Sequence, residues 1–239
     1  MSGHSKWSKI KRDKGANDAK RGAVFTRIGN MIAIAAKAGV DPTMNPSLAM
    51  AIEKARQANM PKDNIQRSID RAADKNAAVL EEITYEGYGP GGVGIIIETA
   101  TDNRNRTLPE VKTALTKNGG TMADPGSVSF QFTRRGVIRV NATGEDALLA
   151  VLDAGAEDAT EEDGELVVYT DMKDLHAVSK AISDAGLEVA DADLQYVANS
   201  EVSVDDAETA RKLLKVLDAI DDCDDVQNVH TNADITVEL

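Results

Sequence analysis

The stretch ITYEGYGPGGVGIIIET, residues 83–99, marks the point where the hydrophobic pattern of the chain changes from helical to extended. Residues 83–88 alternate between apolar and polar side chains, residues 89–92 are the turn-forming Gly-Pro-Gly-Gly, and residues 93–99 are mostly apolar. This order predicts a β-hairpin with a buried second strand. The glycines resemble a phosphate-binding loop, but that loop leads into a helix. Because this one leads into a strand, we interpret it as a hairpin tip.

Upstream of the hairpin, apolar residues recur at spacings of three and four, which is the helical period. Cap residues indicate the helix ends: Asn17 as an N-cap, Gly39 as a stop, and Pro46 and Pro61 at the starts of the next two helices. We therefore predict three short, Ala-rich helices that pack as a small domain. Residues 1–16 have no hydrophobic periodicity, so we predict that they form an arm.

Downstream, the spacing of Thr107 and Glu110 is that of a capping box and predicts a helix that starts at Thr107. The alternation of apolar residues over 128–132 predicts a strand. Residues 137–197 then show the order strand, helix, strand, strand, helix, strand, which is the ferredoxin-like arrangement. A last helix and strand, over 207–231, complete the second α/β domain, whose strand, strand, helix, strand order begins with the hairpin.

The fold class that follows is α+β, with an N-terminal helical domain and two ferredoxin-like α/β domains, one inserted into the other. The chain of 239 residues is long enough for these domains. The predicted boundaries are residues 1–80 for the basic arm and three helices, residues 81–133 with 203–239 for the split α/β domain, and residues 134–202 for the inserted β-α-β-β-α-β domain.

Charge is distributed unevenly along the chain. Residues 1–80 carry 15 Lys and Arg against 7 Asp and Glu, a net charge of +8, whereas residues 81–239 carry 12 against 33, a net charge of −21. A basic head on an acidic body predicts that one region attracts polyanions and the other repels them. For most of the acidic residues, a role in solubility alone is the interpretation we favour.

The first 27 residues hold eight Lys and Arg against two acids, together with Trp7, the only tryptophan of the chain. Basic side chains neutralise phosphates, and an aromatic ring stacks on an unpaired base. The segment therefore predicts a nucleic-acid contact. The alternative is a solvated, frayed terminus with Trp7 packed against a neighbouring element.

Arg104 and Arg106 stand out because only 12 basic residues serve the whole acidic body. We expect them on a strand-to-helix turn beside a helix N-terminus, where anions are favoured. Binding of an anionic ligand and pairing with nearby carboxylates are both open interpretations of these two arginines.

The sequence shows no pattern typical of an enzyme. Its three histidines and Cys223 lack metal-ligand spacing, and no motif for phosphate binding or nucleophilic catalysis occurs. We expect no catalytic residue, metal, cofactor or small-molecule substrate. The run Asp221–Asp225 suits either a weakly held hard cation or a solvated helix end, and we favour the helix end. One cysteine and the lack of a long apolar run predict a cytoplasmic protein with no membrane partner.

Six motifs resemble those of the YebC family, which also includes a mitochondrial translational activator of cytochrome oxidase. They are Gly3–Trp7, Asp18–Gly22, Tyr85–Gly92, Asp102–Thr107, Ala154–Asp158 and Asp221–Gln227. The resemblance extends from Ser2 to about Asn232. It implies an N-terminal helical domain and two α/β domains, the last inserted into the second. It also implies a non-enzymatic role in gene expression, as a DNA-binding transcriptional regulator or as a ribosome-associated RNA-binding translation factor.

The resemblance also implies site residues. The basic motif positions carried over are Lys6, Trp7, Lys20, Arg21, Arg27, Arg104 and Arg106, to which the charge pattern of the arm adds Lys9, Lys11, Arg12 and Lys14. The expected partner is nucleic acid, either DNA or ribosomal or messenger RNA, and the ribosome is a further candidate. A protein-interaction adaptor that binds through its α/β domains is the alternative from a different functional class.

Overall fold

The computed structural model describes residues 18–74 and 77–237, with side chains from Gly22 onward. The predicted arm lies outside these ranges. The described chain divides into two compact units, with boundaries at Thr133/Arg134 and Val197/Ala198. We call residues 134–197 the second unit and the described residues on either side of it the first unit. Within the described ranges, no helix is long and apolar enough to cross a membrane.

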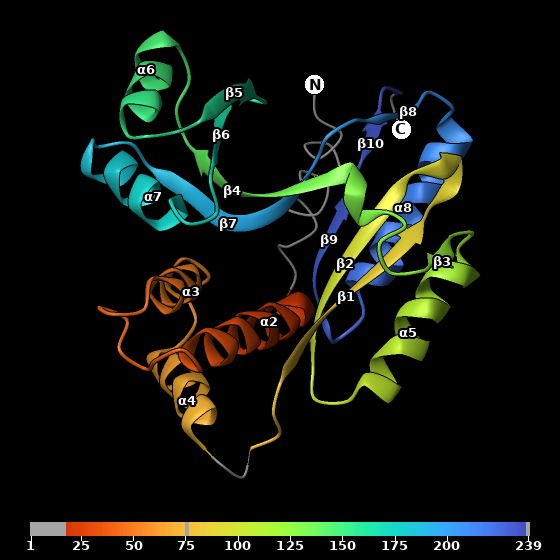
Figure 1. The fold of residues 1–239 in the computed structure, drawn as a ribbon, viewed down its shortest axis with the longest axis horizontal. Helices are drawn as coiled ribbons and strands as arrows, with labels where there is room; N and C mark the ends of the chain where they lie inside the picture. Colours follow the sequence, from red (N-terminus) through yellow and green to blue (C-terminus); the bar gives the residue numbers. More distant parts are fainter. Residues whose placement is uncertain (1–17, 75–76, 238–239) are drawn as a thin grey trace. The chain divides into compact units, whose positions relative to one another are not determined.

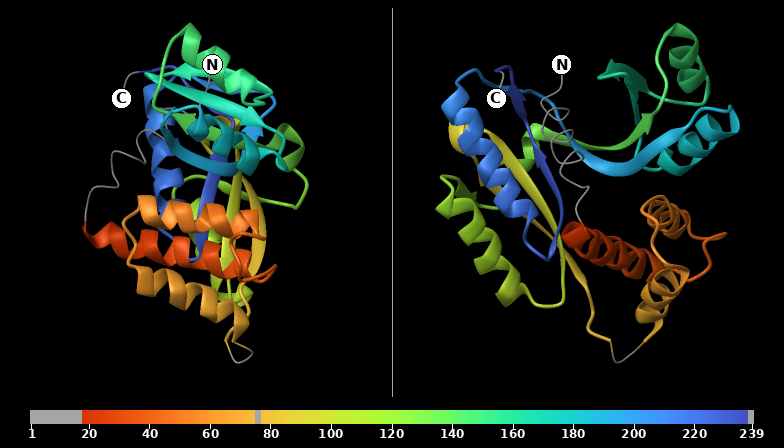
Figure 2. Two further views of the ribbon diagram at one scale, coloured as in Figure 1. Left: turned by 90° about the vertical axis from the view of Figure 1, so that its left-hand side faces the viewer. Right: turned by 180° about the vertical axis from the view of Figure 1, so that it is seen from behind.

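The first unit begins with the three predicted helices, α2 (Asp18–Ala36), α3 (Pro46–Gln57) and α4 (Lys62–Ala73). Asn45 caps α3 by accepting a hydrogen bond from the Leu48 N–H, and Pro46 occupies the first turn. Helix α2 lies between α3 and α4 and packs against both (Figure 2). Their shared core includes Ile28, Ile32, Leu48, Ile52 and Ile65. The predicted N-terminal helical region is confirmed.

The hairpin predicted over residues 83–99 is the centre of a four-stranded sheet (Figure 1). Strands β1 (Glu81–Tyr88) and β2 (Gly94–Thr101) pair antiparallel, and β3 (Thr121–Ala123) and β9 (Val226–Thr231) extend them in the order β3-β1-β2-β9. Helices α5 (Arg104–Lys117) and α8 (Ala207–Asp221) bury Leu115, Leu213 and Leu217 against Ile95 and Ile97. Strands β8 (Val202–Val204) and β10 (Ala233–Ile235) form a separate parallel pair.

The second unit has the predicted order of elements. These are β4 (Phe132–Val140), α6 (Glu145–Asp153), β5 (Asp158–Glu162), β6 (Glu165–Thr170), α7 (Leu175–Asp184) and β7 (Val189–Ala198). The sheet order β5-β6-β4-β7 is the ferredoxin-like one. The sheet of the first unit differs, because its hairpin is central and both later strands join at the edges. The predicted α+β class, with helices first and sheet domains after them, is confirmed.

A buried carboxylate explains why residues 128–132 do not form the predicted strand. Glu86 of β1 accepts hydrogen bonds from the backbone N–H groups of Gly126, Val128 and Ser129 at 2.8, 2.5 and 2.9 Å. The N–H groups of Val128 and Ser129 are therefore not available for strand pairing. Residues 129–131 instead form a short 3-10 turn before β4. Burial acts to raise the pKa of Glu86, but the three donations together outweigh it and hold the pKa below its ordinary value.

We expect Glu86→Gln to destabilise the protein at pH 7 by about 1–3 kcal/mol, because an amide cannot accept all three N–H groups. The pKa of Glu86 is lower in the folded state than in the unfolded state, where it is about 4.3. The carboxylate therefore contributes fully to the free energy of unfolding above the unfolded-state pKa, and this contribution is lost as the pH falls through the folded-state pKa. Urea unfolding at pH 7 and pH 3 checks this, with Glu82→Gln on the exposed start of β1 as the control. An equal Glu86→Gln effect at both pH values would contradict it.

Candidate nucleic-acid interface

Most of the predicted contact residues lie outside the described part of the chain. These are Lys6, Trp7, Lys9, Lys11, Arg12 and Lys14. Lys20 and Arg21 fall in the first turn of α2, where only the backbone is described. Their assignment to nucleic-acid binding stays a prediction. Arg27, Arg104 and Arg106 have described side chains.

Arg27 does not lie on an open helix face. Its Nη1 donates to Asp221 Oδ1 at 3.1 Å, and its Nη2 donates to the main-chain carbonyl of Asp221. Both side chains are only 17% exposed. Asp221 ends α8, where a cation is favoured by the orientation of the last carbonyl groups. Arg27 therefore joins α2 to the end of α8, a contact between segments that are 194 residues apart.

Helix α5 starts one turn earlier than the capping-box spacing predicts. Asn103 is the N-cap, and its side chain accepts from the N–H groups of Asn105 and Arg106 at 3.1 and 3.3 Å. Thr107, the predicted cap, is fully buried inside the helix. Arg104 and Arg106 consequently lie in the first turn of α5 rather than on a connecting turn.

Arg106 is bound to a buried carboxylate, that of Asp225. Its Nη2 lies 2.8 and 2.9 Å from the two carboxylate oxygens, and the hydroxyls of Thr107 and Thr101 lie 2.6 and 3.1 Å from Oδ2. The Asp225 side chain is 11% exposed, whereas that of Arg106 is 52% exposed. Hydrogen bonding to Asp225, followed by its charge, raises the pKa of Arg106. The motif segments 102–107 and 221–227 thus meet in the fold.

The interpretation of Asp221–Asp225 as a solvated helix end is wrong for its two terminal members. Asp221 binds Arg27 and Asp225 binds Arg106. In the described ranges, no group of three or more His, Cys, Asp or Glu side chains is placed to hold a metal ion.

Arg104 makes a weaker kind of contact. Its Nε lies 3.2 Å from Glu81 Oε2, and the two side chains are 67% and 56% exposed. Exposed pairs of this kind contribute little to stability. Of the two interpretations of Arg104 and Arg106, pairing with carboxylates is observed, and binding of an anionic ligand stays a prediction.

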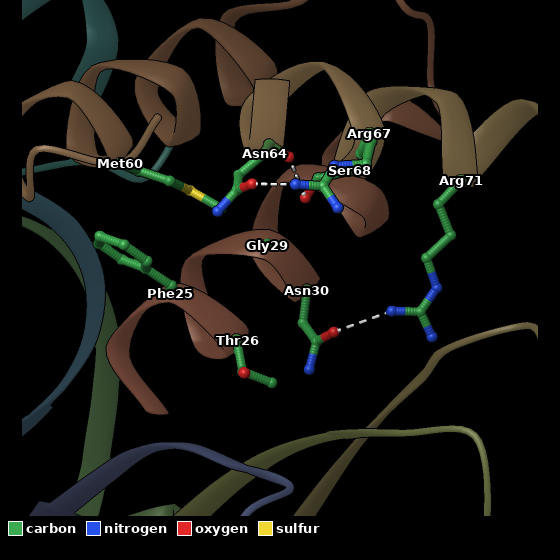
Figure 3. A pocket seen from close by; sticks show the side chains of 9 residues that line it. All are labelled: Phe25, Thr26, Gly29, Asn30, Met60, Asn64, Arg67, Ser68 and Arg71. Atoms are coloured by element: carbon green, nitrogen blue, oxygen red, sulfur yellow. Dashed lines mark hydrogen bonds between the residues drawn. The ribbon is translucent and has the colours of Figure 1, made fainter. Parts of the chain in front are cut away.

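The helical domain contains a groove that the sequence analysis missed. It lies between α2 and α4 and has a volume of about 380 Å³ (Figure 3). Its lining residues are Phe25, Thr26, Gly29, Asn30, Met60, Asn64, Arg67, Ser68 and Arg71. The available signal was the pair Arg67 and Arg71, which are four residues apart and so share one face of the third predicted helix.

Comparison with known proteins relates the whole chain to one family. A model described as the TACO1/YebC protein N-terminal domain matches residues 5–75, and one described as the TACO1/YebC second and third domain matches residues 80–233. A probable transcriptional regulatory protein of Frankia casuarinae is 49% identical over 246 residues, which cover 100% of this chain and 98% of the relative. One of Chlorobaculum tepidum is 49% identical over 242 residues, which cover 99% and 96%.

Among solved structures, the crystal structure of a conserved hypothetical protein from Aquifex aeolicus is similar to this chain. It matches with a TM-score of 0.87 and 39% sequence identity, and the match covers 93% of each chain.

We expect Asp225→Asn to lower the free energy of unfolding by about 1–3 kcal/mol, because an amide accepts fewer hydrogen bonds and leaves Arg106 without its charged partner. Asp224→Asn is the matched control, since it removes the same charge from the exposed neighbouring position, and it should change the free energy by less than about 0.5 kcal/mol. Chemical denaturation of both variants measures the difference. Equal stabilities would contradict the role assigned to Asp225.

Proposed function

This chain belongs to the TACO1/YebC family, and on that premise we propose that it is a non-enzymatic, nucleic-acid-binding regulator of gene expression. The names of its relatives, probable transcriptional regulatory proteins, indicate DNA as the first ligand to test. We further propose that it acts in the cytoplasm, where a reducing environment suits its single cysteine, the buried Cys223.

The observation that carries this proposal is the contrast between paired and unpaired arginines. In the α/β domains, Arg106, Arg135 and Arg139 each have a carboxylate oxygen within 2.8–3.6 Å. In the helical domain, Arg27 and Arg56 also pair with carboxylates, but Arg67 and Arg71 bond only to neutral oxygens among the described residues.

An arginine without a carboxylate keeps its full charge available for phosphate. We therefore propose that the N-terminal domain forms the main contact surface, through the six arm residues Lys6, Trp7, Lys9, Lys11, Arg12 and Lys14 together with Lys20 and Arg21 of α2. Arg27, Arg104 and Arg106 keep a place in the proposed surface only as secondary contacts, because each is already paired. Residues 81–239 carry a net charge of −21 and repel a polyanion, which also favours its binding at the N-terminal domain.

We expect deletion of residues 2–14 to weaken nucleic-acid binding and to leave the described helices folded. The deletion removes five of the eight basic residues found through Arg27. Since each neutralised duplex phosphate contributes about −0.9 to the slope of log K against log salt, the slope should flatten by about 4.5 if all five make contacts. Fluorescence anisotropy at several salt concentrations measures the slope, and thermal melting checks the fold.

Replacing the same five residues by glutamine is the control for chain length. It should reproduce the deletion if charge is the cause. An affinity and a salt slope that match those of the intact protein would rule out the arm as a contact.

A further inference from the structure

Helices α2 and α4 approach closely at Gly29, which lines the groove between them. A Cβ at this position would lie 3.0 Å from Ser68 Oγ, so a larger residue would have to displace the Ser68 side chain. Phe25 and Met60 provide its apolar wall, and Phe25 is only partly buried. Figure 3 shows Asn30, Asn64, Arg67 and Arg71 on the polar side.

The two arginines of the groove are held by amides and not by acids. Arg67 donates to Asn64 Oδ1 and, at 3.2 Å, to the main-chain carbonyl of Asp63. Arg71 donates to Asn30 Oδ1 at 3.3 Å across the groove. A neutral acceptor orients a guanidinium group without neutralising it. Both side chains are exposed, so their charge is oriented and accessible at the same time.

The two acidic residues of α4 form no ion pair with Arg67 or Arg71 among the described residues. Asp63 and Asp70 belong to the same helix, but neither lines the groove. Asp70 accepts instead from Gln66 Nε2 at 2.8 Å. The groove therefore combines two cations, a partly exposed aromatic ring and amide groups within a single small depression.

We propose that this groove binds one nucleotide of a single-stranded nucleic acid, with its phosphate at Arg67 and Arg71 and its base against Phe25. The inference rests on the proposed function, because it takes the ligand to be nucleic acid. An aromatic ring stacks only on a base that is not paired inside a duplex. The volume of about 380 Å³ lies at the lower end of small-ligand sites and suits a single nucleotide.

The shape of the site also favours a single strand over duplex DNA. A helix that reads duplex DNA protrudes into the major groove, which is about 12 Å wide. Here the cations line a depression between two helices, which an extruded base and its phosphate can enter. The side-chain oxygens of Asn30 and Asn64 already accept from Arg71 and Arg67, so the amide N–H groups, above all those of the less buried Asn64, are the donors left for the edge of such a base.

The test compares binding of three labelled probes to the full chain: a fifteen-nucleotide oligo-U RNA, the corresponding oligo-dT DNA, and a mixed-sequence DNA duplex. We expect Arg67→Gln/Arg71→Gln to weaken both single strands at least tenfold and to flatten their salt slope by about 0.7, the contribution of the one phosphate that the two arginines share. Phe25→Leu should weaken both by about fivefold or more, since one base loses its stacking partner. Duplex affinity should change less than twofold in both variants.

Arg56→Gln/Lys62→Gln is the matched control. It removes two exposed charges from the same helical domain outside the groove. It should leave single-strand affinity within about twofold of the starting protein, because neither residue lines the groove and Arg56 is already paired with Glu53. A thermal melt of each variant checks that the domain is folded. Leucine is chosen at position 25 because it keeps an apolar side chain against the core and so preserves the fold.

The outcomes separate this inference from the proposed function. If the starting protein binds none of the three probes, both fail. If it binds them but the Arg67/Arg71 variant, folded, keeps full single-strand affinity, the groove is not a nucleotide site while the proposed function stands. An equal loss on duplex and single strands would overturn the assignment to an unpaired nucleotide.

Discussion

The buried carboxylate of Asp225 connects three separate segments of the first unit. Its oxygens face Thr101 at the end of β2 and Arg106 and Thr107 at the start of α5, while its own carbonyl accepts from the Ala100 N–H at 2.9 Å just before β9 begins. A carboxylate can be buried only if it is paired and hydrogen-bonded, so the first turn of α5 must lie where it does. This requirement fixes the start of α5, and Val111 and Leu115 pack the rest of the helix against the sheet.

The same requirement decides which arginines are available to a ligand. Arg106 is bound to Asp225 and Arg27 to Asp221, so two of the basic positions implied by the family resemblance have a structural role. Arg67 and Arg71, which no motif marked, are oriented only by amides and a main-chain carbonyl. Basic residues in a family motif are therefore not equivalent. Those paired with buried acids hold the fold together, and those held by neutral groups are the better candidates for phosphate.

Periodicity and turn residues sufficed to predict the three helices, the hairpin and the ferredoxin-like order, because those signals are local. The errors arose where a distant group decided the local structure. Thr107 has a cap-like spacing, but its hydroxyl contacts Asp225, 118 residues away. The alternation over 128–132 is strand-like, but Glu86 takes the N–H groups that a strand would use. Strands β3, β8 and β10 have three residues each, too few for a periodic signal. The groove lies between helices that pack closely at Gly29, which spacing along the chain does not reveal.

The central claim is that the N-terminal domain meets nucleic acid while the arginine–carboxylate contacts of the α/β domains serve the fold. Hydrogen-exchange mass spectrometry of the full chain, with and without a saturating single-stranded oligonucleotide, tests it directly because it reports on every segment at once. The account predicts slower exchange in peptides from residues 1–74, including α2 and α4, a smaller change in residues 101–107, and no change in the second unit. Protection concentrated at residues 101–107 or within 134–197, with residues 1–74 unchanged, would contradict it.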